Sequence, residues 1–288
     1  MTSDPALDLV HETLAQLKER GVKLRVPAAT LQQLAETANF TRPDAAVTPA
    51  SAPEIVKVAP PSAPTAPAPP VPPRPADPAA TAEKAARLED LRGPVLACTN
   101  CAHLVKSRTQ VVFGVGNPDA ELMFVGEAPG EDEDRRGEPF VGKAGHLLTK
   151  IIETMGFARS DVYIANVLKC RPDMPPGSSG NRKPTAGEMQ TCLPYLRQQI
   201  EIIQPRVLVA LGATAMEGLL GETQPMNRLR GRWHEFNGIP LMATYHPAYL
   251  LRNQALSEKR KVWEDMLMVL QKLGRPISEK QRNYFLAK

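Results

Sequence analysis

The chain has 288 residues, 42% of them hydrophobic, and a formal net charge of +4 at pH 7. This length allows one or two domains, and the hydrophobic content is enough to build a core. No apolar run approaches the roughly 18 residues of a membrane-spanning helix, and the N-terminal residues lack the basic-then-apolar order of a secretory signal. These features predict a cytoplasmic protein without a membrane partner.

Residues 1–42 are expected to form a short helical N-terminal segment. The segment is small, so independent stability is not expected of it. It is either a solvated amphipathic tail or a docking helix for a protein partner. Its apolar residues recur at helical spacing, first at Leu7, Val10, Leu14 and Leu17 and then at Leu31 and Leu34.

Residues 43–82 are predicted to be a disordered Pro/Ala-rich linker. Thirteen of the 29 prolines lie between Pro43 and Pro78, and such a segment is extended and cannot pack a core. Up to residue 82 the chain carries seven Lys/Arg and eight Asp/Glu, whereas the remainder carries 28 and 23. A modestly basic body suits a polyanionic partner, although charge alone fixes neither fold nor activity.

Short apolar runs alternate with helical patterns over residues 83–275, which leaves a C-terminal tail at 276–288. The predicted strands are ELMFVG, DVYIANVLK, RVLVALG and PLMATYHP, and the predicted helices are AGHLLTKIIETMG, TCLPYLRQQIEIIQ, ATAMEGLLG and residues 257–273. This alternation indicates an α/β fold with a parallel sheet covered on both faces. Sites in such sheets form at the carboxyl ends of the strands, where Glu127, Asn166 and His246 are expected.

The four cysteines form one close pair, Cys98 and Cys101, and two distant positions, Cys170 and Cys192. A disulfide framework is not expected in a cytoplasmic protein. Four thiolates can hold zinc or a cubane iron–sulfur cluster. The spacing alone selects neither metal, and unrelated buried thiols remain an alternative.

Four ordered motifs, GEAPGEDED, GEPFVGKAGHLL, ANVLKCRP and HPAYLLR, together with the cysteines, resemble those of the type-four uracil-DNA glycosylases, the iron–sulfur branch of that superfamily. The resemblance spans about residues 88–273 and leaves the tail and linker unexplained. It implies a three-layer α/β/α sandwich around a four-stranded, mainly parallel sheet. It also implies removal of uracil from DNA and a [4Fe–4S] cluster. The implied ligands are Cys98, Cys101, Cys170 and Cys192, although the loop before Cys192 is longer than expected for the family.

The chemistry of a flipped base fits three of the matched residues. Phe140 is suited to stack on a pyrimidine, and its flanking glycines allow close approach of the backbone. Uracil presents an acceptor at O4 and a donor at N3, and one Asn amide, that of Asn166, satisfies both. A neutral His246 near uracil O2 stabilises the negative charge on the departing base. The alternatives are a core aromatic, which the flanking glycines disfavour, and a strand-end cap, which fits Asn166 equally well without the resemblance. Without the resemblance, His246 reads as a loop histidine.

The glycine turn of GEAPG is expected to approach DNA and sugar through Gly126, Ala128, Pro129 and Gly130. Glycosylases of the best-known branch place a water-activating aspartate where this chain has Ala128. Glu127 is therefore the candidate replacement, although its side chain points differently if the turn is preserved. Glu133 and Asp134 are expected to be solvated carboxylates.

The residues after His246 are candidates for a wedge that enters the minor groove and fills the space left by the base. They are Leu250, Leu251 and Arg252, and the alternative is simply the start of a helix.

Three other functions have distinguishable sequence features. A relative that forms a covalent link to uracil-DNA uses a histidine in the loop after the third cysteine, and residues 171–191 contain none. A non-catalytic, polymerase-associated DNA-binding module receives mild support from the Pro/Ala-rich segment. A nucleotide-binding α/β enzyme lacks its motif, since neither G-x-G-x-x-G nor a P-loop is present. The sequence therefore predicts a monomeric uracil-DNA glycosylase of base-excision repair.

Overall fold

The computed structural model describes residues 77–175, 178, 180–221 and 223–286. The predicted helical segment at 1–42 and the linker up to residue 76 lie outside the described residues. The first described helix, α3 (Pro78–Leu96), begins inside the segment predicted to be linker. Asp77 caps it by accepting hydrogen bonds from the main-chain N–H groups of Ala79 and Ala80. None of the helices described is long and apolar enough to cross a membrane.

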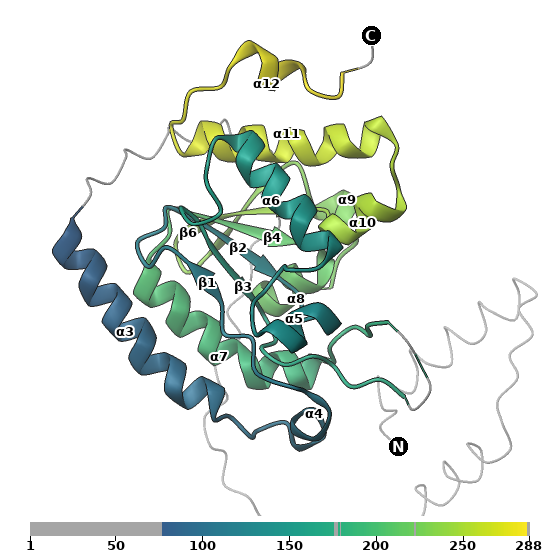
Figure 1. Ribbon diagram of the computed structural model, residues 1–288. Coiled ribbons are helices and arrows are strands. Elements are labelled where there is room, and N and C mark those ends of the chain that lie inside the picture. The colour runs from purple at the N-terminus through teal and green to yellow at the C-terminus, as the bar shows by residue number, and fades with distance from the viewer. Residues whose placement is uncertain (1–76, 176–177, 179, 222, 287–288) are drawn as a thin grey trace, which may run out of the picture. The chain divides into compact units, whose positions relative to one another are not determined.

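A six-stranded sheet forms the centre of the body (Figure 1). Its order is β1-β3-β2-β4-β6-β5, and the four inner strands are parallel. The strands are β1 (Val115–Gly116), β2 (Leu122–Gly126), β3 (Tyr163–Asn166), β4 (Val207–Leu211), β5 (Trp233–Phe236) and β6 (Ile239–Thr244).

Helices cover both faces of this sheet, as the alternating pattern predicts. Successive residues of β2 enter opposite cores, with Met123 and Val125 in one and Leu122 and Phe124 in the other. The first core is completed by α3, α7 (Ala186–Ile203) and α8 (Ala213–Leu220), and the second by α6 (Lys143–Met155) and α11 (Leu256–Lys272). The predicted α/β/α sandwich is confirmed.

The shorter helices lie in the connections. They are α4 (Ala102–Ser107), α5 (Glu131–Arg136), α9 (Met226–Leu229), α10 (Pro247–Arg252) and α12 (Glu279–Asn283). Each is at most six residues long, which is too short for hydrophobic periodicity to reveal.

The sheet has two strands more than the four expected, and both are antiparallel edge strands. β1 has only two residues and pairs with β3. β5 and β6 form a hairpin across Asn237 and Gly238, which both have positive φ, of 49° and 78°. An Asn-Gly dipeptide is the preferred sequence of such a turn, so this hairpin could have been predicted.

The C-terminal segment packs on the body rather than extending from it. The Trp263 indole donates to the main-chain oxygen of Gln281 (2.5 Å), and the Gln281 amide donates to the Thr154 oxygen (2.9 Å). The ring of Tyr284 also meets Trp263 edge-on at 5.5 Å. The body of the described chain therefore runs from Asp77 into the predicted tail.

Candidate active site

The carboxyl ends of the parallel strands bring together three of the residues named from the sequence. Gly126 ends β2 and is paired with Asn166, which ends β3. His246 follows β6 by two residues, and Gly212, directly after β4, lies against it. A Cβ on Gly212 would lie 3.2 Å from the His246 Cβ, at a φ of +97° that disfavours other residues.

Phe140 reaches this edge from the loop between α5 and α6. Its ring is buried and lies 5.5 Å from the His246 ring, with 30° between the two planes. It adopts an unusual positive φ of 55°. Glycines make room on both sides, because a Cβ on Gly126 would lie 2.6 Å from the Phe140 ring and one on Gly145 would lie 1.8 Å from its carbonyl oxygen.

Asn166 is 2% exposed, and its side-chain oxygen lies beside Gly126 and Phe140. A Cβ on Gly126 would come within 2.3 Å of that oxygen. No donor in the described part of the chain hydrogen-bonds to it. A buried amide oxygen without a partner is costly, and such groups in folded proteins call for an explanation such as a ligand.

His246 is held in one tautomer by the start of α10. Its Nδ1 accepts a hydrogen bond from the main-chain N–H of Ala248 (3.1 Å), which caps the helix. Burial, with a smaller effect of the Arg252 charge, lowers the pKa of His246 to about 4. The imidazole is therefore neutral near pH 7, with its proton on Nε2 as a donor.

Glu127 follows β2 and turns toward the start of α8. The Thr214 side chain hydrogen-bonds to it, while burial raises the pKa of its carboxyl group above the usual range. The more distant charge of Lys183 acts in the opposite direction. A carboxylate in this position is a stronger base than an exposed one, because burial disfavours its charged form.

The two acids expected to be solvated, Glu133 and Asp134, instead hold loops. Glu133 accepts hydrogen bonds from the main-chain N–H groups of Gly130 (3.1 Å), Val141 (3.0 Å) and Gly142 (3.1 Å). Asp134 is 3% exposed and accepts from the Thr109 N–H at 2.9 Å. The expectation was wrong because unpaired N–H groups of irregular loops need acceptors that sequence patterns do not reveal.

This anchoring fixes the GEAPG turn and the Phe140 loop relative to each other. Glu133 bonds to both segments, and Arg159 donates to the Pro139 carbonyl oxygen (2.7 Å) on the other side of Phe140. Within the turn, Ala128 is partly buried and Pro129 is buried.

The candidate wedge residues occupy α10 and differ in exposure. Leu250 is buried at 4%, whereas Leu251 is 38% exposed and Arg252 is exposed. Leu250 thus packs in the body and cannot enter DNA in this conformation. The side chains of Leu251 and Arg252 are exposed and are free to contact DNA.

The four cysteines come from three segments and converge beside the first core. Cys98 and Cys101 precede α4, Cys170 follows β3, and Cys192 lies in α7. Burial raises the pKa of the Cys101 thiol, and the nearby Cys170 and Cys98 raise it further. Burial also raises the pKa of Cys192 to about 11, and the same two cysteines add to the effect.

Several described groups donate to the cysteine sulfurs, including the Tyr195 side chain to Cys98. The Arg108 guanidinium lies 3.0 Å from the Cys170 Sγ and also donates to the Cys98 carbonyl oxygen (2.7 Å). The main-chain N–H of Lys169 donates to the Cys192 Sγ at 3.2 Å. No three of the four sulfurs lie within 4.8 Å of one another.

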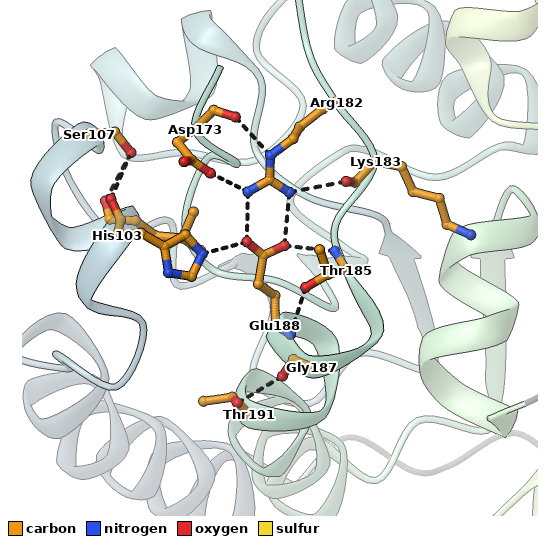
Figure 2. A network of polar contacts seen from close by, with 10 residues as sticks. His103, Ser107, Asp173, Arg182, Lys183, Thr185, Gly187, Glu188 and Thr191 are labelled. Atoms are coloured by element: carbon orange, nitrogen blue, oxygen red, sulfur yellow. Dashed lines mark hydrogen bonds and ion pairs between the residues drawn. The ribbon is translucent and has the colours of Figure 1, made fainter. Parts of the chain in front are cut away.

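Ion pairs hold the segments that carry these cysteines (Figure 2). Arg182 donates to both oxygens of Glu188, at 2.6 and 2.9 Å, and to the carboxylate of Asp173. His103 Nε2 lies 2.7 Å from Glu188 Oε1. The Arg182 hydrogen bonds lower the pKa of Glu188 to about 2. His103, Asp173 and Glu188 have the spacing of a cation site, but the Arg182 guanidinium already supplies the positive charge.

Sequence reasoning missed Thr214, Arg108 and Lys169. Nothing in the local pattern marks Thr214 or Arg108, since only the fold places them beside Glu127 and Cys170. Lys169 carried a signal, because it is a charged residue inside the apolar run VYIANVLKC. It is 1% exposed, and burial lowers its pKa to about 8.

The carboxyl edge of the sheet thus gathers an aromatic ring, an amide and a neutral histidine, side chains that can stack on a planar ring and hydrogen-bond to its edge. A family model of the uracil DNA glycosylase superfamily matches residues 113–267, so the chain belongs to that superfamily. A type-4 uracil-DNA glycosylase of Thermotoga maritima is 47% identical over 60% of this chain and 87% of its own length. Those of Archaeoglobus fulgidus (43%) and Sulfurisphaera tokodaii (40%) match 60% and 69% of this chain and 87% and 90% of their own lengths.

Proposed function

We propose that this chain removes uracil from DNA by hydrolysing its N-glycosidic bond, which leaves an abasic site for base-excision repair. The observation that carries this proposal is the buried Asn166 oxygen beside Phe140, which has no donor among the described residues. An extruded uracil supplies that donor from N3, and its O4 accepts from the same amide. Release of free uracil from a uracil-containing oligonucleotide tests the proposal.

The reaction uses the two titratable groups of the site in different ways. As the glycosidic bond breaks, the sugar gains oxocarbenium character and the base leaves as an anion. His246 donates from Nε2 to uracil O2 and stabilises that anion. Glu127 removes a proton from the water whose oxygen bonds to the sugar carbon. Phe140 forms the floor on which the base rests.

DNA is held at the same edge. The GEAPG turn offers backbone from Gly126 to Gly130 to the strand, and the exposed Leu251 and Arg252 enter the duplex from α10. The buried Leu250 anchors α10 in the body.

Glu127→Gln tests the source of the attacking water. We expect turnover to fall by about 10²- to 10⁴-fold, the usual contribution of a general base, while binding to uracil-containing DNA is retained. Because the pKa of Glu127 is raised, wild-type turnover should decline on the acid side at a pH above the ordinary carboxyl range. The measurement is single-turnover excision against pH, with Glu89→Gln, an exposed position on α3, as the matched control. Near-normal turnover in Glu127→Gln would mean that Glu127 only shapes the turn.

The four cysteines fit a [4Fe–4S] cluster better than a single zinc ion. A zinc ion about 2.3 Å from each sulfur requires sulfurs roughly 3.8 Å apart, whereas no three of these sulfurs lie within 4.8 Å of one another. Hydrogen bonds to the sulfurs, such as those from Arg108 and the Lys169 main chain, are typical of cluster sites. Cys98, Cys101, Cys170 and Cys192 would hold the cluster, which supplies a structural tie between α4, β3 and α7.

The purified protein should be brown under anaerobic conditions and contain iron and acid-labile sulfide. Cys101→Ser should lower the thermal midpoint and the yield of folded protein more than it lowers uracil excision per folded molecule, because a lost ligand loosens the loop that the metal closes. Metal and sulfide analysis with thermal melting checks both expectations. Zinc without sulfide would refute the cluster.

Residues 1–82 contain none of the residues of the site. We therefore expect that deleting residues 1–76, which leaves the α3 cap Asp77 in place, keeps excision from short oligonucleotides within about three-fold of the full chain. Excision by the two proteins is compared at equal concentrations of folded protein. Complete loss of activity would show that the N-terminal segment contributes to the site.

We further propose that the protein is monomeric and cytoplasmic and that residues 1–42 bind a protein partner. A polymerase-associated, non-catalytic module remains the second candidate function. The combination of Glu127, Asn166 and His246 argues for catalysis, and the uracil-release assay separates the two.

A further inference from the structure

Lys169 is a buried cation that the proposed reaction does not use. Its side chain is 1% exposed. In the sequence it lies between Asn166, the residue proposed to recognise the base, and Cys170. Its ammonium group donates to the Asn166 main-chain oxygen (2.9 Å) and to the Gln199 side-chain oxygen (2.5 Å). Both acceptors are uncharged.

No carboxylate pairs with this ammonium in the described ranges of the chain. A buried charge without a counter-ion is strongly unfavourable, so a negative group nearby would stabilise the charged ammonium. A thiolate at Cys192, such as a bound metal would stabilise, favours the charged form of Lys169. The main-chain N–H of Lys169 also bonds to that sulfur at 3.2 Å. Lys169 therefore contacts the cysteine site and the base-reading strand end at once.

The acceptors of the ammonium are themselves fixed. The Gln199 amide, from α7, donates to the Phe113 carbonyl oxygen (3.0 Å) and to the Tyr163 hydroxyl (3.3 Å) at the start of β3. Gln199 and Lys169 thus form a buried polar chain that runs along β3 to Asn166. Each group in this chain has at least one hydrogen-bond partner, which favours a single arrangement of the chain.

We infer that Lys169 is a positioning residue that links the cysteine site to uracil recognition. Its charge is balanced by the thiolates of the cysteine site. The hydrogen bond from its ammonium group fixes the main chain of Asn166, so that the Asn166 amide is held where it must meet the base. The inference rests on the proposed function and on a thiolate-ligated cluster at the four cysteines. It assigns one side chain to two tasks that would otherwise be separate.

Lys169→Met removes both the charge and the donor with little change in volume. In fully loaded protein we expect iron release to a chelator to become about ten-fold faster. Uracil excision per loaded molecule should fall about ten-fold or more in kcat/KM. Lys84→Met is the matched control, because Lys84 is also well buried but pairs with Asp119 (2.6 Å) far from the site. It should leave both rates within about two-fold.

Lys169→Gln separates the two tasks and replaces Lys169→Met if that variant does not fold. It removes the charge but keeps an N–H donor, so iron release should be accelerated while excision per loaded molecule is largely retained. Unchanged iron release in both variants would overturn the inference, as would unchanged excision in loaded Lys169→Met. If wild-type protein holds the cluster but releases no uracil, the proposed function fails instead, and the iron-release comparison still reports on the charge.

Discussion

Asn166→Asp should nearly abolish uracil excision, by about 10⁴-fold or more, and this is the largest effect expected of any single change. The ionised carboxylate of this variant repels uracil O4, whereas the wild-type amide donates to it. A site built to hydrogen-bond its substrate discriminates by such factors because a mismatched group leaves buried polar atoms without partners. The buried environment of Asn166, at 2% exposure, makes the mismatch costly. Single-turnover excision on a uracil oligonucleotide measures the loss.

The same variant should gain a trace of activity on cytosine. When its new carboxyl group is protonated, that group donates to cytosine N3 and accepts from the exocyclic amine, which is the reverse of the pattern for uracil. Asn237→Asp, in the β5–β6 turn, is the matched control and should behave as wild type. Retention of more than about a tenth of wild-type uracil turnover in Asn166→Asp would contradict the role of Asn166 as the reader of the base.

The fold could be predicted wherever hydrophobic periodicity extends over a whole element. β2 and β4 are continuous apolar runs, and α6 and α11 have clear apolar faces, so the parallel sheet and its covering helices follow from the sequence. Edge strand β1 has two residues and carries no pattern. The start of α3 was obscured by prolines, yet Asp77 followed by Pro78 is a helix-start signal.

The site residues that follow a strand or lie in a motif could be predicted from the sequence. The residues that only tertiary contacts bring to the site could not. Gly126, Asn166 and His246 follow strands, so their convergence is expected of any parallel sheet. The role of Leu250 could not be separated from that of Leu251, because burial within one short helix depends on how that helix packs on the body. The Glu133 contacts to main-chain N–H groups up to nine residues away depend on loop geometry that no local pattern encodes.

His246→Ala should lower turnover about 10²-fold while uracil remains the preferred base. The variant removes the Nε2 donor that stabilises the departing anion, and loss of one such donor typically costs about this factor. Recognition through Asn166 is left in place, so discrimination between uracil and cytosine should change little. The turnover number and the uracil-to-cytosine ratio are measured on matched oligonucleotides.

The cap that His246 provides must be separated from its catalytic role. His246→Ser supplies a shorter side chain that still caps α10 but cannot reach the base. It should therefore restore stability relative to His246→Ala without restoring turnover. Recovery of wild-type turnover in His246→Ser would show that the histidine acts only as a helix cap.

The pH dependence gives a second, independent check on His246. With a folded pKa of about 4 against an ordinary value of 6.5, the ring stays neutral as pH falls from 8 to 5. The unfolded chain takes up a proton through the ordinary value, so any stability that His246 contributes declines between about pH 6.5 and 4. If protonation of His246 limited turnover near pH 6.5, the wild type would lose activity there and His246→Ala would not. We expect no such difference. A loss of that kind would mean that protonated His246 forms in the working range, which contradicts its role as a neutral donor.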